Sequence, residues 1–267
     1  MESVSMVVPD CFPDGKRYNT FVGYYKRVYG ERLQKLVIDA GFTCPNRDGT
    51  VGYGGCSFCD NAAFHPSYST AGKSIAAQID EGIEFHQVRY RNTRHYLAYF
   101  QSYSNTYAPL TRLKELYLEA LSHPHIVGIV IGTRPDCIDE EKLDWLADLK
   151  AGRALPDWRR DGFGSPVVKV EYGIESCYDA TLLRVGRGHD VAAAERAVRL
   201  SAERGLDPGA HFILGLPGES RSMLVEQCSF ISSLPLHSVK FHQLQLVKGT
   251  RIEKEYAAVP HDFLRLD

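Results

Sequence analysis

The sequence predicts an α/β fold in which parallel strands alternate with helices to form a partial barrel of six βα units. Short apolar segments typical of buried strands alternate with segments whose apolar residues recur every three or four positions. The 267 residues leave room for six such units but not for the eight of a closed barrel. No linker or change of composition divides the chain. We therefore expect one barrel over residues 33–267, with residues 1–32 as an N-terminal cap or extension.

The strand and helix candidates follow one another in a regular order. Strands are predicted at residues 36–38, 95–101, 126–131, 166–174, 210–214 and 239–246. Helices are predicted at residues 74–90, 109–121, 139–150, 190–204 and 221–234, with a weaker one at 250–257. The strand candidates are short and rich in aliphatic or aromatic residues, whereas the helix candidates carry an apolar stripe.

Local signals set several of these boundaries. Pro109 stands near the first turn of a helix, where its fixed backbone angle is tolerated, and Asp139 and Asp190 can each cap a helix. The segment 126–131 is apolar throughout, as expected for a parallel strand that is covered on both faces. Residues 151–166, which contain Gly, Pro and three arginines, are predicted to form an exposed loop.

Composition and charge exclude several functional classes. The chain is 44% hydrophobic and 24% charged, which is ordinary for a globular protein. A net charge of −2 gives no overall attraction to nucleic acid or to an anionic membrane. No apolar run approaches the roughly 20 residues that span a bilayer, and the N-terminus lacks the features of a signal peptide. Seven cysteines are an odd number and suit a reducing compartment, so we expect a cytoplasmic protein without membrane contact.

The loop at residues 41–61 holds the strongest functional signal. It contains Cys44 and a Cys-x-x-Cys pair formed by Cys56 and Cys59, together with five glycines that let the backbone fold tightly. Thiolates are soft ligands that bind zinc, copper or iron–sulfur clusters. The spacing therefore indicates that this loop binds a metal ion or a cluster.

The loop by itself leaves three alternatives open. A closed tetrahedral zinc site needs a fourth ligand, which His65 could supply. An iron–sulfur cube normally takes four cysteines, so a cube held by three would leave one iron open to chelation by a small molecule. In the third alternative, the cysteines are reduced and only pack in the interior.

The other strand ends favour the open cluster. In a parallel α/β barrel, the loops after the carboxyl ends of the strands build the active site. Polar residues follow the later strands at this edge, namely Gln101, Ser102, Asp136, Glu175, His242 and Gln243. A structural zinc ion explains none of these residues. A cluster that holds a polar, charged small molecule explains them together.

Several motifs give the chain a family resemblance over roughly residues 33–250. They are Gly-Phe-Thr-Cys-Pro-Asn-Arg-Asp-Gly-Thr (41–50), Gly-Gly-Cys-Ser-Phe-Cys (54–59), Thr-Arg-Pro-Asp (133–136), Tyr-Gly-Ile-Glu-Ser (172–176), Arg-Gly-His (187–189) and Ile-Leu-Gly-Leu-Pro-Gly-Glu (213–219). With these motifs the chain resembles radical S-adenosylmethionine (radical SAM) enzymes, in the bacterial branch related to the catalytic subunit of Elongator. One departure is that eleven residues separate Cys44 from Cys56, whereas the commonest family spacing is three.

The resemblance implies a partial (βα)6 barrel of the radical SAM type, with a [4Fe–4S] cluster on Cys44, Cys56 and Cys59 and with S-adenosylmethionine on the fourth iron. Reductive cleavage would then give a 5′-deoxyadenosyl radical. By this resemblance, Phe58 would lie near the adenine of S-adenosylmethionine, Gln101 and Ser102 would contact its amine, and Asp136 and Glu175 would contact its ribose. Arg187 would contact its carboxylate, and Ile213, His242 and Gln243 would lie on the strands that face the adenine. The resemblance does not identify a catalytic residue.

The resemblance to the catalytic subunit of Elongator favours tRNA, and its wobble uridine in particular, as the substrate. A flavodoxin or ferredoxin is expected as the electron donor. Three basic clusters could contact RNA: Arg17, Lys26, Arg27 and Arg32; Arg89, Arg91 and Arg94; and Arg153, Arg159 and Arg160. They could equally be solvated surfaces. Two alternatives stay open. One is a radical enzyme that acts on a peptide or small metabolite, and the other is a module that is stabilised by a structural zinc ion and binds RNA or protein without catalysis.

Overall fold

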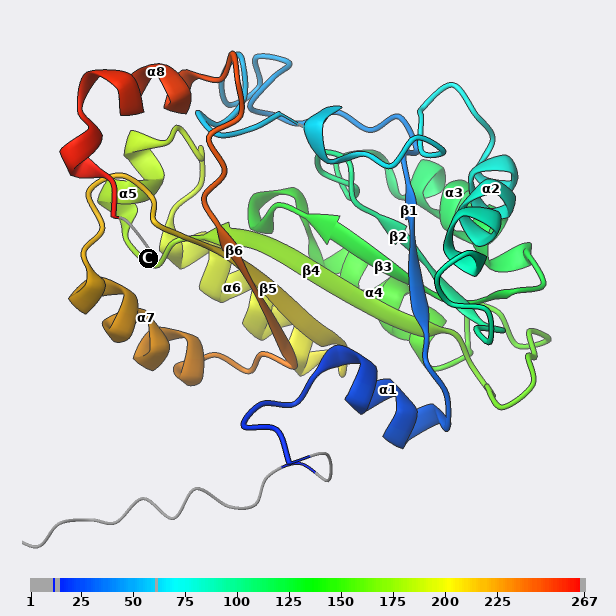
Figure 1. Ribbon diagram of the computed structural model, residues 1–267. Helices are drawn as coiled ribbons and strands as arrows, with labels where there is room; N and C mark the ends of the chain where they lie inside the picture. The colour runs from blue at the N-terminus through cyan, green and yellow to red at the C-terminus, as the bar shows by residue number, and fades with distance from the viewer. Residues whose placement is uncertain (1–11, 13–14, 61, 265–267) are drawn as a thin grey trace, which may run out of the picture.

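The computed structural model describes residues 12, 15–60 and 62–264, and its centre is one parallel sheet with strand order β1-β2-β3-β4-β5-β6 (Figure 1). The strands are β1 Gln34–Ile38, β2 Tyr96–Phe100, β3 Ile126–Thr133, β4 Val167–Glu175, β5 Asp207–Leu214 and β6 Ser238–Gln243. Each strand pairs in parallel with the next. The sheet curls into a half-barrel, which confirms the predicted fold class.

Helices connect the strands. They are α1 Phe21–Tyr29, α2 Ile75–Gln87, α3 Leu110–Ser122, α4 Glu140–Lys150, α5 Asp179–Arg184, α6 Val191–Glu203, α7 Arg221–Ser233 and α8 Arg251–Ala258. Single 3-10 turns lie at Ala62–Phe64, Pro135–Cys137 and Pro260–Asp262. Sequence periodicity missed α5 because six residues are too few to show it. Within the described ranges, no helix has the length and apolar character needed to cross a membrane.

Side-chain caps fix the starts of all the described helices except α3 and α5. Asp139 accepts a hydrogen bond from the backbone N–H of Lys142, and Asp190 accepts one from that of Ala193, so both predicted caps are confirmed. Such a bond satisfies one of the backbone donors that a helix leaves free at its first turn. α3 begins directly after Pro109, which makes no side-chain cap.

The two faces of the sheet pack against different elements. Residues such as Ala98, Ile129 and Val170 point outward into the main core, which α2, α3, α4 and α6 cover. A smaller core lies on the concave face, where Tyr25 of α1 meets Tyr99. Figure 1 shows α1 at the end of the sheet from which the strands start. The division of the chain at residue 32 stays a prediction, and most of its first fourteen residues lie outside the described part.

The half-barrel has two outer strands, β1 and β6. The free edge of β1 is capped by side chains: the Val37 N–H donates to Tyr68 Oη at 3.0 Å, and the Asp39 N–H donates to Gln78 Oε1 at 2.8 Å. Gln78 Nε2 donates back to the Asp39 carbonyl at 2.9 Å. In the part of the chain that the structure describes, no side chain caps the outer edge of β6 in this way.

Candidate cluster and cofactor site

The cysteine loop leaves β1 at the carboxyl end of the sheet and is tied to the segment between α5 and α6. Asn46 Nδ2 donates to the carbonyls of Gly186 and Arg187, each at 2.8 Å. The Ser57 N–H donates to the Val185 carbonyl at 2.8 Å. Gly188 is required here because an added Cβ would lie 2.4 Å from Asn46 Oδ1 and because its φ is +78°. These contacts hold the loop in one conformation over the end of the sheet.

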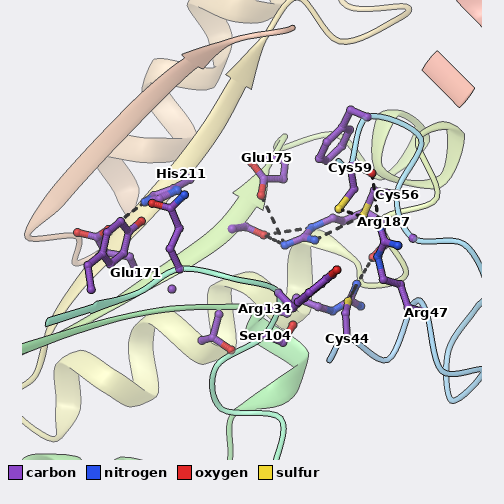
Figure 2. Close-up of a pocket in the computed structure, with 18 residues that line it drawn as sticks. Cys44, Arg47, Cys56, Cys59, Ser104, Arg134, Glu171, Glu175, Arg187 and His211 are labelled. Atoms are coloured by element: carbon purple, nitrogen blue, oxygen red, sulfur yellow. Dashed lines mark hydrogen bonds and ion pairs between the residues drawn. The ribbon is translucent and has the colours of Figure 1, made fainter. Parts of the chain in front are cut away.

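The three cysteines of this loop line a single cavity of about 180 Å³ (Figure 2). A different arginine faces each sulfur, with Arg47 Nη2 3.4 Å from Cys59 Sγ, Arg187 Nη1 3.6 Å from Cys56 Sγ and Arg134 Nη1 3.9 Å from Cys44 Sγ. Burial raises the pKa of the Cys59 thiol, and the guanidinium of Arg47 acts in the opposite direction. The cavity is therefore a positively charged pocket for thiolates and for whatever they bind.

The spacing of the ligands argues against a single bound ion. Within the described residues, no three His, Cys, Asp or Glu side chains are grouped so that they could hold one metal ion. His65 does not reach the cavity, because its Nε2 lies 2.8 Å from Ser102 Oγ and its Nδ1 lies 3.7 Å from Asp39 Oδ2. The zinc alternative is thus not supported. Cysteines of a four-iron cluster each bind a different iron, and a cluster in this cavity would have Cys44, Cys56 and Cys59 in its lining as ligands.

A second cavity of about 390 Å³ continues from the first towards β6. Five residues line both cavities, namely Phe58, Cys59, Gln101, Glu175 and His211. Ile213, His242 and Gln243 line the second one only, and Arg187 lines the first only. The structure therefore brings together most of the residues expected to contact S-adenosylmethionine. Burial, reinforced by the charge of Lys240, lowers the pKa of His242 to about 4, which leaves it neutral at pH 7.

Glu175 has the most constrained backbone at this site. It ends β4 with a φ of +73°, at a shift in the register between β4 and β5. Its Oε1 lies 3.5 Å from Arg187 Nη2. Gly173 makes this pair possible, because an added Cβ would lie 2.5 Å from the carboxylate oxygen and 2.7 Å from the guanidinium. Such a left-handed conformation in a non-glycine residue is costly and is typical of functional sites.

Two of the expected contact residues do not line either cavity. Ser102 is 1% exposed, and its hydroxyl is bonded to His65. Asp136 lies in a 3-10 turn and forms a bidentate ion pair with Arg134, at 2.9 Å from Nε and 2.7 Å from Nη2. The chain turns sharply after β2, with a φ of +60° at Tyr103, so Tyr103 faces the cavity in place of Ser102.

Comparison with known proteins decides the family. Residues 44–231 match the sequence model of the Radical SAM superfamily. The chain belongs to this superfamily. It is 37% identical to Protein YhcC of Escherichia coli K12 over 244 residues, which cover 91% of this chain and 73% of that protein.

Two further matches concern Methanocaldococcus infernus. The radical SAM chain is 28% identical to its tRNA uridine(34) acetyltransferase over 129 residues, or 47% of this chain and 21% of that protein. The solved structure of its Elp3 with an N-terminal deletion matches with a TM-score of 0.58 at 18% identity, over 86% of this chain and 50% of that one. The second likeness shows the fold alone, and the chain spans only half the length of that structure.

The radical SAM site also contains residues that the strand-end rule missed. Glu171 is 5% exposed and lies inside the half-barrel, where Lys35 Nζ donates to Oε1 at 2.5 Å and His211 Nε2 lies 3.1 Å from Oε2. Burial alone would raise the pKa of Glu171, but the charge of Lys35 and the bond from His211 outweigh it and hold that pKa well below its usual range. The alternation of residues 169–175, in which every second side chain faces inward, was the available signal.

Proposed function

We propose that the chain is an enzyme that binds a [4Fe–4S] cluster through Cys44, Cys56 and Cys59 and cleaves S-adenosylmethionine reductively. The observation that carries this proposal is the convergence of the three thiols on a cavity that continues into a second, polar cavity. Together the two volumes, of about 180 Å³ and 390 Å³, fall in the range that holds a small organic ligand. When bound, the cluster and S-adenosylmethionine supply one-electron, hydrogen-abstracting chemistry.

The residues of the chain bind, orient and shield the cluster and S-adenosylmethionine. Arg47, Arg134 and Arg187 place positive charge beside the sulfurs and so stabilise the thiolate form that ligates iron. Glu175 offers a carboxylate to the second cavity, where it can accept hydrogen bonds from hydroxyl groups of a ribose. Arg187, which Glu175 and the Gly173 carbonyl hold in place, can bind a carboxylate.

Anaerobic reconstitution tests this proposal. Protein treated with iron and sulfide should contain both elements, and after addition of dithionite and S-adenosylmethionine it should release 5′-deoxyadenosine. Colourless protein that holds about one zinc ion and no sulfide would contradict it. In the cell, we propose that a flavodoxin or ferredoxin replaces dithionite, and that the enzyme works in the cytoplasm, which keeps free thiols such as Cys177 and Cys228 reduced.

We also propose tRNA, with its wobble uridine, as the substrate. The partial match to a tRNA uridine(34) acetyltransferase supports this assignment. So does a cavity of about 510 Å³ on the outer side of the cysteine loop, lined by Arg47, Tyr53, Lys248 and Arg251. Tyr53 is 82% exposed and can stack on a base, while the basic side chains can contact phosphates.

The three basic clusters expected to bind RNA lie elsewhere. They lie on and on either side of α1 and in the segments before β2 and β4, so they are at the end of the barrel from which the strands start. Several of these side chains also serve the fold: Arg153 pairs with Asp148 at 2.6 Å, and Arg160 donates to the Leu121 carbonyl at 3.1 Å. The RNA contact is therefore better placed at the cysteine loop than at these clusters.

Binding of bulk tRNA at neutral pH tests the substrate. We expect affinity that falls steeply with added salt, and release of 5′-deoxyadenosine that rises when tRNA is present. The variant Arg251→Gln should weaken tRNA binding, whereas Arg153→Gln, at the opposite end, should not. Absence of binding at low salt would favour the alternative of a peptide or small-metabolite substrate.

A further inference from the structure

A third cavity, of about 580 Å³, lies inside the half-barrel between α1, β6 and the concave face of the sheet. Among the elements that line it are α1, β1 and β6, which are labelled in Figure 1. Glu171 and His211 line both this cavity and the cluster cavity, and Lys240 lines both this cavity and the second one. The third cavity is therefore next to the place where a radical would be generated.

Lysine side chains give this cavity an excess of positive charge. Three lysines and one glutamate line it: Lys35, Lys169, Lys240 and Glu171. Glu171 is already neutralised by its contacts with Lys35 and His211. No described carboxylate forms an ion pair with Lys169 or with Lys240. Neither lysine is therefore in a direct ion pair, although Glu171 attracts both of them and Glu175 also attracts Lys240.

Lys169 is the more unusual of the two, because it is only 2% exposed. Its Nζ lies 3.2 Å from His237 Nδ1 and 3.5 Å from Ser238 Oγ, and both partners are neutral acceptors. Asp207, which also acts on Lys169 electrostatically, is paired with Lys150 at 2.9 Å. Burial lowers the pKa of Lys169 in spite of the attraction of Glu171. A buried ammonium group without an anionic partner is costly, and an anion in the cavity would remove that cost.

We propose that this cavity binds a small organic molecule that carries a phosphate or carboxylate group, held by Lys169 and Lys240. Phe21, Leu236 and Val239 supply apolar surface for the rest of the molecule, and the volume suits a compound larger than an inorganic anion. The role of this compound, as substrate or co-substrate of the radical chemistry, rests on the proposed function. Its binding does not, since it needs neither S-adenosylmethionine nor electron transfer.

Calorimetric titration of the reconstituted holoenzyme with two probes, inorganic phosphate and succinate, at constant ionic strength tests the site. At least one probe should bind, and the comparison tells a phosphate site from a carboxylate site. Lys169→Met should weaken that binding by about tenfold or more, the effect of losing one charge-assisted hydrogen bond. Lys240→Gln should also weaken it. Lys254→Met, which changes an exposed lysine on α8 outside the cavity, should not.

The result is decisive in either direction. Failure of both probes to bind, or equal affinity in the wild type and both cavity variants, would overturn the proposal. If Lys169→Met does not fold, Lys240→Gln, which removes the charge but keeps the edge strand polar, carries the test alone. Loss of tRNA binding in Lys169→Met without any binding of the small anions would assign the cavity to RNA instead. Absence of 5′-deoxyadenosine together with anion binding would refute the proposed function and leave this site standing.

Discussion

Replacing Glu171 by glutamine removes a buried carboxylate inside the half-barrel and leaves its cationic partner Lys35 in place, together with His211. Lys35 and His211 contact Glu171 at 2.5 Å and 3.1 Å, and their side chains are only 19% and 16% exposed. Breaking a buried pair by removing one partner costs about 3 kcal/mol or more, because a charge is left without compensation. For a chain of this size that corresponds to a fall of roughly 6–12 °C in the melting temperature.

The pH dependence of this loss has a defined sign. The folded state lowers the pKa of Glu171 below its unfolded value of about 4.3. The carboxylate therefore stabilises the fold fully above about pH 5, and the stabilisation disappears as the pH falls towards the folded pKa. The difference in melting temperature between the wild type and Glu171→Gln should be constant from about pH 6 to 8 and should shrink below about pH 4.

A matched control is available on the surface. Glu115 pairs with Arg112 at 3.0 Å, but both side chains are more than half exposed. Glu115→Gln should change the free energy of unfolding by less than about 0.5 kcal/mol. Thermal unfolding of both variants, followed by circular dichroism, makes the comparison. If Glu171→Gln melts within a degree or two of Glu115→Gln, the interior ion pair is solvated and the reasoning is refuted.

Three further variants test the site and the sheet. Cys56→Ala should abolish cluster assembly because two thiolates cannot hold it, whereas Cys228→Ala on the exposed face of α7 should keep its iron; full iron content in Cys56→Ala would refute the ligand assignment. Glu175→Ala should weaken binding of S-adenosylmethionine by about 1–3 kcal/mol in equilibrium dialysis, and an unchanged affinity would move the ribose contact elsewhere. Gly128→Ala should destabilise the fold by about 1–3 kcal/mol, because its Cβ would lie 2.2 Å from a carbonyl oxygen of β4. Gly72→Ala, with open space around it, should stay within about 0.5 kcal/mol in the same denaturation assay, and equal effects of the two changes would contradict the packing argument.

Periodicity and spacing were enough to predict the strands, the longer helices and the cysteine loop. Each of these rests on a pattern that is local in the chain: the apolar run of β3, the Asp139 cap and the Cys-x-x-Cys pair. The predicted boundaries were close for the same reason. The largest offsets are three residues: α2 ends at Gln87 rather than at residue 90, β5 begins at Asp207 rather than at residue 210, and β6 ends at Gln243 rather than at residue 246.

Side-chain direction in the loops could not be predicted from the sequence. Ser102 follows a strand as Gln101 does, but the turn at Tyr103 directs its hydroxyl to His65, and no local pattern encodes that turn. Asp136 was expected at the cofactor, yet Arg134 is close enough to bind it bidentately. Such choices depend on residues that only the fold brings together.

The two outer strands of the half-barrel have opposite consequences for self-association. An uncapped strand edge offers a row of hydrogen-bonding groups to any second extended chain. The amide of Gln78 and the hydroxyl of Tyr68 occupy those groups along β1, which closes that edge to strand addition. At β6 the exposed Lys240 is the deterrent, because a charged side chain on an edge disfavours the approach of another strand. Changing Lys240 to an apolar residue would therefore create an aggregation-prone edge next to the exposed ring of Phe241.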